Sequence, residues 1–283
     1  MLTSRKIKKK LKAISVIEII ASAYQEISKK EMNRIREMTL KNREFIEELS
    51  KIYFEAEKAY FFQKKFEKKQ KKKKKEEDTF SSKKGKVAIF FSANARFYGT
   101  LILSIWQETL KYLNQNKADL IIIGEIGKYL AGKKNLPSKV HYFNLDDEDP
   151  KEEEVRKIVS FIKDYSEIKI FHGKFKTILS QEIAQTDISG EVSGKEAGEI
   201  SAYLFEPSPE AVLDFFKTEL ISAFFAQAFL EHRLSRHATR MVKMYQTRDR
   251  AKERREKLRM QEKKLKWQNF DRKQREINVS SQT

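Results

Sequence analysis

Apolar residues recur every three or four positions over two long stretches, one near each end of the chain. From Lys6 to about Phe62 there is no proline or glycine, and the apolar series begins at Ile7, Leu11 and Ile14. This spacing places apolar side chains along one face of an α-helix. It predicts one long amphipathic helix, or two in near continuity, about 80 Å long at 1.5 Å per residue. Such a helix must project from a domain or pair with another helix.

The second stretch begins at a pair of prolines. Pro207 and Pro209 interrupt what precedes them, Ser208 is a candidate N-cap, and Glu210 places negative charge in the first helical turn. No glycine or proline follows as far as Ile277, which predicts a helix about 100 Å long. Its apolar stripe consists of Val212, Phe216, Leu220, Phe224, Leu230, Leu234, Ala238, Met241 and Tyr245.

Between the two stretches, short apolar runs alternate with helical patterns. The runs predict strands and the patterns predict helices, and this alternation is typical of a compact α/β domain with a mainly parallel sheet. The predicted elements are strands at Val87–Phe91, Leu120–Ile123 and Ile168–Phe171, helices at Leu101–Leu113 and Glu152–Tyr165, and one further candidate strand at Ser201–Phe205.

The predicted fold class is therefore α+α/β: a long antiparallel coiled coil of the N- and C-terminal helices plus a central α/β domain. The predicted divisions are 1–63 for the first helix, 64–85 for a basic linker, 86–206 for the α/β domain, 207–278 for the second helix and 279–283 for a tail. The linker holds five consecutive lysines, Lys71–Lys75. It reads as a solvated segment, and a tether for nucleic acid or acidic lipid is the alternative.

Composition narrows the classes of partner. The 59 Lys and Arg residues exceed the 41 Asp and Glu residues, which gives a net charge of +18. Acidic partners are therefore attracted, and nucleic acid, an anionic membrane surface and an acidic protein all qualify. The absence of cysteine excludes disulfides and thiolate metal sites. The longest apolar runs fall far short of the roughly 20 residues of a membrane span.

The charge pattern also bears on the coiled coil. Pairing the two helices brings Lys6, Lys8, Lys9, Lys10 and Lys12 near some of Arg248, Arg250, Lys252, Arg254 and Arg255 or their neighbours. Like charges at this density repel, and an acidic partner around the coil would relieve the repulsion. The sequence thus indicates that the coil lies inside another structure.

Two motifs at matching separation resemble one family. Residues 203–214, YLFEPSPEAVLD, are similar to the segment Y-L-Y-E-P-D-P-x-x-L-L-D of ATP synthase gamma subunits, and residues 238–244, ATRMVKM, fall where that family has A-A-R-M-V-A-M. Lys6–Leu11 is similar to the family's E-I-R-x-K-I. Leu120–Gly124, with Gly127 and Lys128, is similar to its strand followed by G-x-K-G.

The resemblance implies a non-catalytic rotor shaft without a cofactor, present in one copy inside a ring of alpha and beta subunits. The α/β domain would form a foot, with an epsilon-like subunit, on a membrane c-ring or an alternative load. The complex would lie peripherally at the cytoplasmic face of the cell membrane, with no nucleic acid bound.

The resemblance also implies residue roles. Foot contacts are expected at Tyr203 and Glu206. The coiled-coil seam is expected at Ile7, Leu11, Ile14, Leu234, Ala238, Met241 and Tyr245. Contacts with the catalytic ring are expected at Lys8, Lys9, Lys12, Arg248, Arg254, Arg255, Lys266 and Trp267.

Three segments depart from the family pattern. Val16–Ala21 stands where the family has N-T-Q-K-I-T, and Lys266–Asp271 where it has R-Q-x-x-I-T. The turn S-D-R-G-L-C-G-G is reduced to Ser92–Gly99. The first two segments are ring contacts in the family, so the ring is expected to differ as well. We expect a divergent copy, from a specialised rotary ATPase working against another load.

No motif for catalysis emerges. Gly190–Lys195 is one residue short of a phosphate loop, and Glu196 replaces its Ser or Thr. His232 and His237 are five residues apart, so they are interpreted as seam or surface residues rather than metal ligands. The alternatives left open are a basic coiled-coil protein bound to nucleic acid or the ribosome, and an adaptor on the cytoskeleton or a membrane surface.

Overall fold

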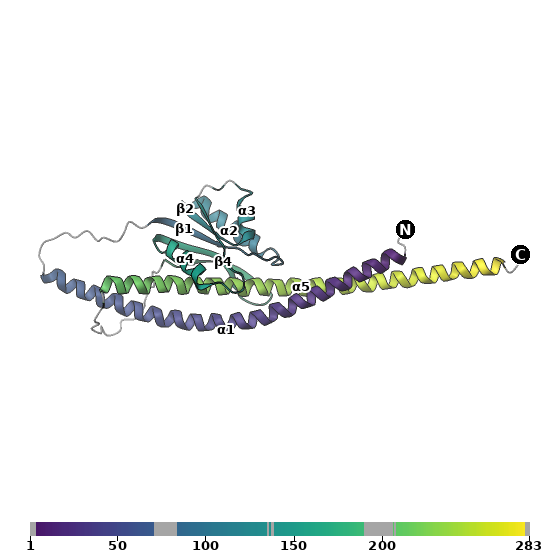
Figure 1. Ribbon diagram of the computed structural model, residues 1–283, viewed down its shortest axis with the longest axis horizontal. Coiled ribbons are helices and arrows are strands. Elements are labelled where there is room, and N and C mark those ends of the chain that lie inside the picture. Colours follow the sequence, from purple (N-terminus) through teal and green to yellow (C-terminus); the bar gives the residue numbers. More distant parts are fainter. Residues whose placement is uncertain are drawn as a thin grey trace.

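Two long helices lie side by side and carry one α/β domain on their flank (Figure 1). The structure, a computed structural model, describes residues 4–70, 84–134, 136, 139–189, 206 and 208–280. Helix α1 spans Ser4–Gln70 and helix α5 spans Pro209–Ser280. They run antiparallel, and the C-terminal end of α5 extends beyond the start of α1. The predicted fold class is confirmed.

The α/β domain contains one five-stranded sheet in the order β3-β2-β1-β4-β5. The central strand β1 (Lys84–Phe91) pairs in parallel with β2 (Ala118–Ile123) and with β4 (Tyr165–Phe175). At one edge β3 (Val140–Phe143) is parallel to β2. At the other edge β5 (Gln181–Asp187) is antiparallel to β4. The mainly parallel sheet follows the prediction.

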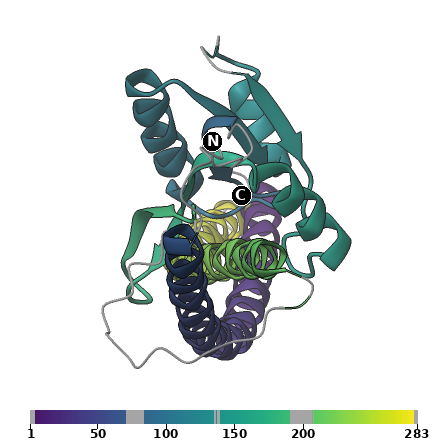
Figure 2. The same cartoon turned by 90° about the vertical axis from the view of Figure 1, so that its left-hand side faces the viewer.

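Helix α5 belongs both to the coiled coil and to the domain. One face of the sheet packs against α2 (Leu101–Gln115) and α3 (Glu125–Ala131), where Phe90 meets Trp106. The other face packs against α4 (Glu152–Ile162) and α5, where Phe91 contacts Phe225 and Phe229 edge to face. Figure 2, viewed along the helices, shows that α5 lies between the α/β domain and α1. Helix α5 therefore supplies side chains both to the coil and to the core of the domain.

Strands β3 and β5 and helix α3 were not predicted from the sequence. Strand β5 is polar at most positions because it lies at an exposed edge, so it has no apolar run to mark it. Helix α1 continues to Gln70, and β1 begins at Lys84, so both enter the stretch assigned to a linker. The five-lysine run, Tyr203 and the candidate strand Ser201–Phe205 lie outside the described residues.

Candidate functional interface: the helix seam and the buried junction

The seam between α1 and α5 consists of three apolar clusters separated along the coil. The first, near the start of α5, joins Leu49 and Tyr53 to Leu220. The second joins Met32 and Ile35 to Leu230, Leu234 and Ala238. The third, far from the α/β domain, joins Ile7 and Ile14 to Ala251 and Leu258, with Leu11 and Leu265 packed against it.

Polar contacts fix the register of the two helices. Asn42 donates to the carbonyl oxygen of Ala223 at 3.1 Å and to the side-chain oxygen of Gln227 at 3.0 Å. Arg43 pairs with Glu231 at 2.9 Å, and Glu18 pairs with Arg255 further along. Hydrogen bonds form only over a narrow range of distances and angles, so a shift in the register of the helices would leave the side-chain amide of Asn42 without its two partners.

The structure places six of the seven proposed seam residues in or against these clusters. Ile7, Ile14, Leu234 and Ala238 are buried, and Leu11 and Met241 pack beside them. Tyr245 is 52% exposed and lies under the guanidinium of Arg248, 5.3 Å from its ring centre. The buried positions continue instead at seven-residue spacing through Met244, Ala251 and Leu258, so Tyr245 lies beside the seam and not in it.

A buried polar junction joins α5 to the ends of the central strands. His232 is fully buried between β1 and β4. Its Nε2 donates to the carbonyl oxygen of Ser92 at 2.9 Å, and its Nδ1 accepts the N–H of Gly173 at 3.1 Å. The backbone partners fix the neutral tautomer, and burial holds the pKa of His232 well below its ordinary value. This imidazole thus ties the diverging strand ends to α5.

One helical turn further, Arg236 is buried against the loop that follows β3. Its guanidinium donates to the Asp147 carboxylate at 2.6 Å and to the Asp147 carbonyl oxygen at 3.1 Å. The second carboxylate oxygen accepts the N–H groups of Asn94 at 2.8 Å and Ala95 at 3.0 Å. Asp147 therefore connects the helix to the loop after β1, and removal of either charge would leave the other buried and unpaired.

Glu148 continues this network. Its carboxylate lies 3.4 Å from Arg233 and 3.2 Å from His237. Burial alone would raise the pKa of Glu148, but the hydrogen bond and charge of His237, with the charges of Arg233 and Arg236, lower it to about 2. His232 and His237 thus face the α/β domain, and the interpretation of them as seam or surface residues is wrong.

Arg240 closes the junction at the far edge of the domain. Its guanidinium donates to the hydroxyl of Tyr98 and lies 4.5 Å above that ring, with the ring of Tyr24 on α1 at 5.6 Å. Burial raises the pKa of Tyr98, although the charges of Arg236 and Arg240 oppose the shift. This contact joins α1, α5 and the α/β domain at one point.

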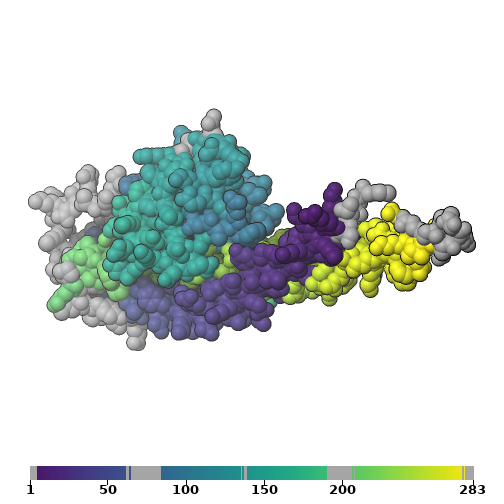
Figure 3. Space-filling view, turned by 45° about the vertical axis from the view of Figure 1, so that its right-hand side comes forward, coloured from purple at the N-terminus to yellow at the C-terminus, as the bar shows by residue number. Residues whose placement is uncertain are grey.

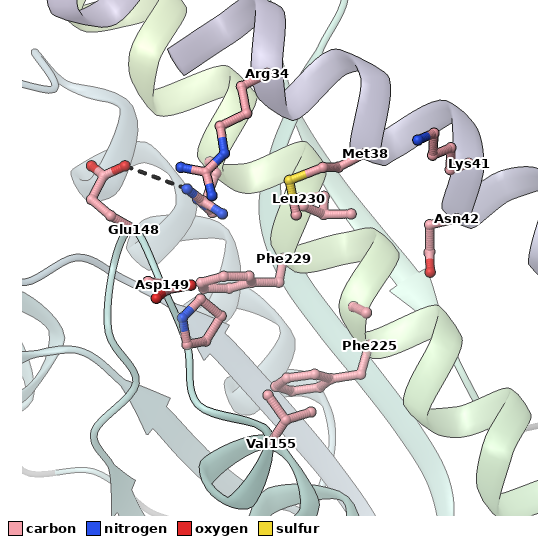
Figure 4. A pocket seen from close by; sticks show the side chains of 13 residues that line it. Arg34, Met38, Lys41, Asn42, Glu148, Asp149, Val155, Phe225, Phe229 and Leu230 are labelled. Atoms are coloured by element: carbon pink, nitrogen blue, oxygen red, sulfur yellow. Dashed lines mark hydrogen bonds and ion pairs between the residues drawn. The ribbon is translucent and has the colours of Figure 1, made fainter.

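A groove of about 510 Å³ opens beside the junction, between α1, α5 and the segment 148–155 (Figure 4). Its floor is apolar, formed by Phe225, Phe229 and Val155, and Figure 4 shows Arg34 and Glu148 near one end. Among the described residues, no three His, Asp or Glu side chains gather as metal ligands.

The comparisons with known proteins assign this architecture to a family. A family model described as ATP synthase matches residues 3–269. The chain belongs to the ATP synthase gamma family.

Relatives in this gamma family are distant in sequence. The ATP synthase gamma chain of Macrococcus caseolyticus is 26% identical over 169 residues, which cover 56% of this chain and 58% of that protein. The gamma chain of Staphylococcus aureus strain JH9 is 26% identical over 153 residues, 50% of this chain and 52% of that protein. The chain thus matches little more than half the length of these curated relatives.

A solved structure supports the fold. The chain resembles a chain in the cryo-EM structure of the central stalk and c-ring of Tetrahymena thermophila mitochondrial ATP synthase, with a TM-score of 0.56 and 14% identity. The match covers 80% of this chain and 98% of that chain. At this identity, the likeness establishes the gamma fold alone.

The ring contacts expected for a gamma subunit are placed as follows. Lys8, Lys9, Lys12 and Arg254 are exposed on the part of the coil beyond the domain. Arg255 pairs with Glu18, Lys266 lies 3.5 Å from Glu262, and Trp267 is exposed. The helices are antiparallel and Glu18 of α1 pairs with Arg255 of α5. Residues 6–12 of α1 therefore lie opposite residues of α5 that follow Arg255, so their lysines face later residues than the basic residues 248–255 named from the sequence. Glu206, the expected foot contact, is exposed.

The junction residues were not found from the sequence. Arg233, Arg236 and Arg240 follow one another at spacings of three and four, which places them on one helix face, but charged residues on a long helix usually indicate a solvated face. The acidic run Asp146–Asp149 after β3 was the complementary signal. Only the docking of α5 on the sheet brings the two together.

Proposed function

We propose that the chain is the central rotor shaft of an F-type or F-type-like rotary ATPase. It couples ATP turnover in a ring of alpha and beta subunits to rotation of a membrane ring or another load. The main observation is that α1 and α5 pair in antiparallel and project well past the α/β domain (Figure 3). Membership of the gamma family supports this role.

Transmission of torque follows from the double role of α5. The helix contributes Ile221, Phe225 and Phe229 to the core of the α/β domain and Leu234 to the seam. The buried junction fixes the same helix to the loops after β1 and β3. A twist of the projecting coil therefore turns the α/β domain without passing through a linker.

The proposal includes partners and location. The chain is non-catalytic and present in one copy, with a ring of alpha and beta subunits around the coil. An epsilon-like subunit and a c-ring or other load contact the α/β domain. The complex is peripheral at the cytoplasmic face of the cell membrane. In the described residues, no helix has both the length and the hydropathy required to cross a bilayer.

Rotation of a labelled shaft tests the proposal. The chain has no cysteine, so Tyr129→Cys on the exposed side of α3 provides a single attachment point for a bead. The chain is co-expressed with cysteine-free alpha and beta subunits from the same genome, and the ring is fixed to a surface. We expect ATP to drive rotation of the bead in one direction, and a non-hydrolysable ATP analogue to stop it.

Two results would overturn the proposal. One is a ring that assembles and hydrolyses ATP without incorporating this chain. The other is a chain that binds nucleic acid with an affinity that falls steeply with salt and never joins a ring, which is the behaviour expected of the basic coiled-coil alternative.

A further inference from the structure

The groove beside the junction has charged ends that the rotor role does not use. Arg34 and Lys41 of α1, Arg233 of α5 and Glu148 of the α/β domain all line it. Figure 4 shows Arg34 and Glu148 near one end and Lys41 at the other, with the apolar floor between them. The groove therefore combines an apolar surface with cations at defined positions.

Two guanidinium groups converge at one end of this groove. A nitrogen of Arg34 and a nitrogen of Arg233 each lie 4.0 Å from the same oxygen, Oε2 of Glu31. This distance is too long for a hydrogen bond, and the oxygen has no hydrogen-bond partner among the described residues although it is buried. Neither arginine thus has a close carboxylate at the point where they meet.

Arg233 is the more demanding of the two arginines because it is buried. It is only 2% exposed, and its Nε has no hydrogen-bond partner within the described part of the chain. It lies 3.4 Å from Glu148, a carboxylate that His237 also contacts. Burial lowers the pKa of Arg233, although the charge of Glu148 opposes the shift. A further acceptor at this guanidinium would therefore stabilise its charged form.

The rest of the groove is apolar and has the size of a small-molecule site. Phe225, Phe229 and Val155 form the floor, and Met38 and Leu230 also line it. Its volume of about 510 Å³ falls within the roughly 300–1,000 Å³ that is usual for sites of small ligands. Such sites combine apolar walls with a few polar groups that orient the ligand.

We propose that the groove binds a small amphipathic monocarboxylate of the medium-chain fatty acid type. The carboxylate lies between Arg34 and Arg233, since guanidinium groups bind carboxylates through paired hydrogen bonds. The aliphatic chain lies on Phe225 and Phe229 and removes apolar surface from water. Such a ligand contacts α1, α5 and the segment 148–155 at once, so its binding stabilises the attachment of the coil to the α/β domain.

The charges on the walls argue against other ligands. Asp149 also lines the groove, and its negative charge opposes a phosphate dianion more strongly than a monocarboxylate. A cationic amphiphile would place positive charge beside Arg34 and Arg233. A protein helix requires an apolar groove several turns long, whereas charged residues bound this floor at both ends.

Titration calorimetry of the full-length chain with decanoate, below the concentration at which it forms micelles, tests the site. Decyltrimethylammonium keeps the chain but not the carboxylate, and acetate keeps the carboxylate but not the chain. We expect saturable binding of one decanoate per chain and at least tenfold weaker binding of the other two probes. Decanoate binding that does not saturate, or equal affinity for decyltrimethylammonium, would overturn the proposal.

A matched pair of variants locates the carboxylate. Arg34→Gln should weaken decanoate binding at least fivefold. Arg36→Gln makes the same charge change at an exposed position of α1 that does not line the groove, and its affinity should stay within twofold of the unsubstituted chain. Equal affinities of the two variants, with equal helix content by circular dichroism, would contradict the assigned site.

A third variant locates the aliphatic chain. Ala226→Leu adds bulk to the wall of the groove and should weaken decanoate binding at least fivefold while helix content stays unchanged. Unaltered binding by this variant would show that the chain lies elsewhere. These measurements use the free chain, so their outcome does not depend on assembly with other subunits and leaves the proposed function to its own test.

Discussion

The two halves of the coil differ in what surrounds them. In the proximal half, where α5 lies against the sheet, residues Leu220 to Arg240 are mostly buried by α1 on one side and by the domain on the other. In the distal half, the buried apolar residues of α5 are Met244, Ala251 and Leu258, and most other described side chains are exposed. The proximal half is therefore buried by the chain itself, whereas the distal half leaves most of its apolar and charged surface in solvent.

The difference explains where charge is tolerated. In the proximal half Arg233 and Arg236 are almost fully buried because Glu148 and Asp147 compensate them. In the distal half the basic residues remain in solvent, and Glu18 is one of the acids that pair with them. A shaft that must be rigid at its base and adaptable at its end would show this distribution.

The largest effect is expected from breaking the buried charge pair of the proximal half. Arg236→Ala leaves the Asp147 carboxylate without its cation, which costs about 3–5 kcal/mol in the free energy of unfolding. The exposed pair of Arg156 and Glu152 serves as the control, since Arg156→Ala should cost less than about 1 kcal/mol. Urea unfolding followed by fluorescence of the buried Trp106 measures both variants. Equal costs would mean that the junction does not support the domain.

Next come two isoleucines that are both fully buried, one in each half of the coil. Ile35→Ala in the proximal seam should lower the free energy of unfolding by about 2–4 kcal/mol. Ile7→Ala removes the same atoms from the distal seam, but we expect that end to open locally before the domain unfolds, because few other apolar residues are buried there. The Trp106 transition should then move by less than about 0.5 kcal/mol. A shift in Ile7→Ala as large as that in Ile35→Ala would remove the distinction between the halves.

Acid should weaken the proximal half selectively. The pKa values of His232 and His172 are lowered by burial, so the unfolded chain takes up protons below about pH 6.5 that the folded chain does not. The free energy of unfolding should fall by up to about 1.4 kcal/mol per pH unit for each histidine as the pH drops from 6.5. Below about pH 4.5 the loss of the Glu148 carboxylate adds to this, because its folded pKa is about 2.

Urea titrations at pH 7.5, 6.5 and 5.5 measure this dependence, with His141→Asn as the control because His141 packs on Phe161 outside the junction. His232→Asn should flatten the slope between pH 6.5 and 5.5. An unchanged slope in that variant would show that the junction histidine does not account for the acid sensitivity.

The smallest effect is expected in the distal half. Glu18→Gln removes the carboxylate that pairs with Arg255, and the cost should not exceed about 1 kcal/mol because the arginine keeps access to water. Helicity of the distal coil, followed by circular dichroism at low and high salt, should fall slightly at low salt only. A salt-independent loss would indicate a packing effect instead of an electrostatic one.

The sequence revealed the features that follow a regular repeat. Both long helices were predicted from the spacing of apolar residues and the absence of proline and glycine, and the strands containing Ile89, Ile121 and Ile170 were predicted from their apolar runs. The same reasoning missed β5, which is mostly polar because it lies at an exposed edge of the sheet. It also placed Tyr245 on the seam, whereas the neighbouring Met244 is the buried position.

The buried polar junction could not be predicted from the sequence, for a different reason. Arg236 and Asp147 lie 89 residues apart, and neither is unusual in its local segment. Their pairing depends on the angle at which α5 crosses the sheet, which is set by contacts such as Phe91 with Phe225. No local sequence pattern determines that angle, so the burial of Arg233, Arg236 and Arg240 is evident only from the tertiary structure.

Amide hydrogen exchange of the chain, free and bound to the alpha and beta ring, tests the contrast between the two halves most directly. In the free chain, residues 4–27 and 241–280 should exchange much faster than residues 28–60 and 215–240. In the complex, the distal segments should become protected while the proximal segments change little. Equal protection of both halves in the free chain, or no gain in distal protection on assembly, would contradict a shaft that is completed by its ring.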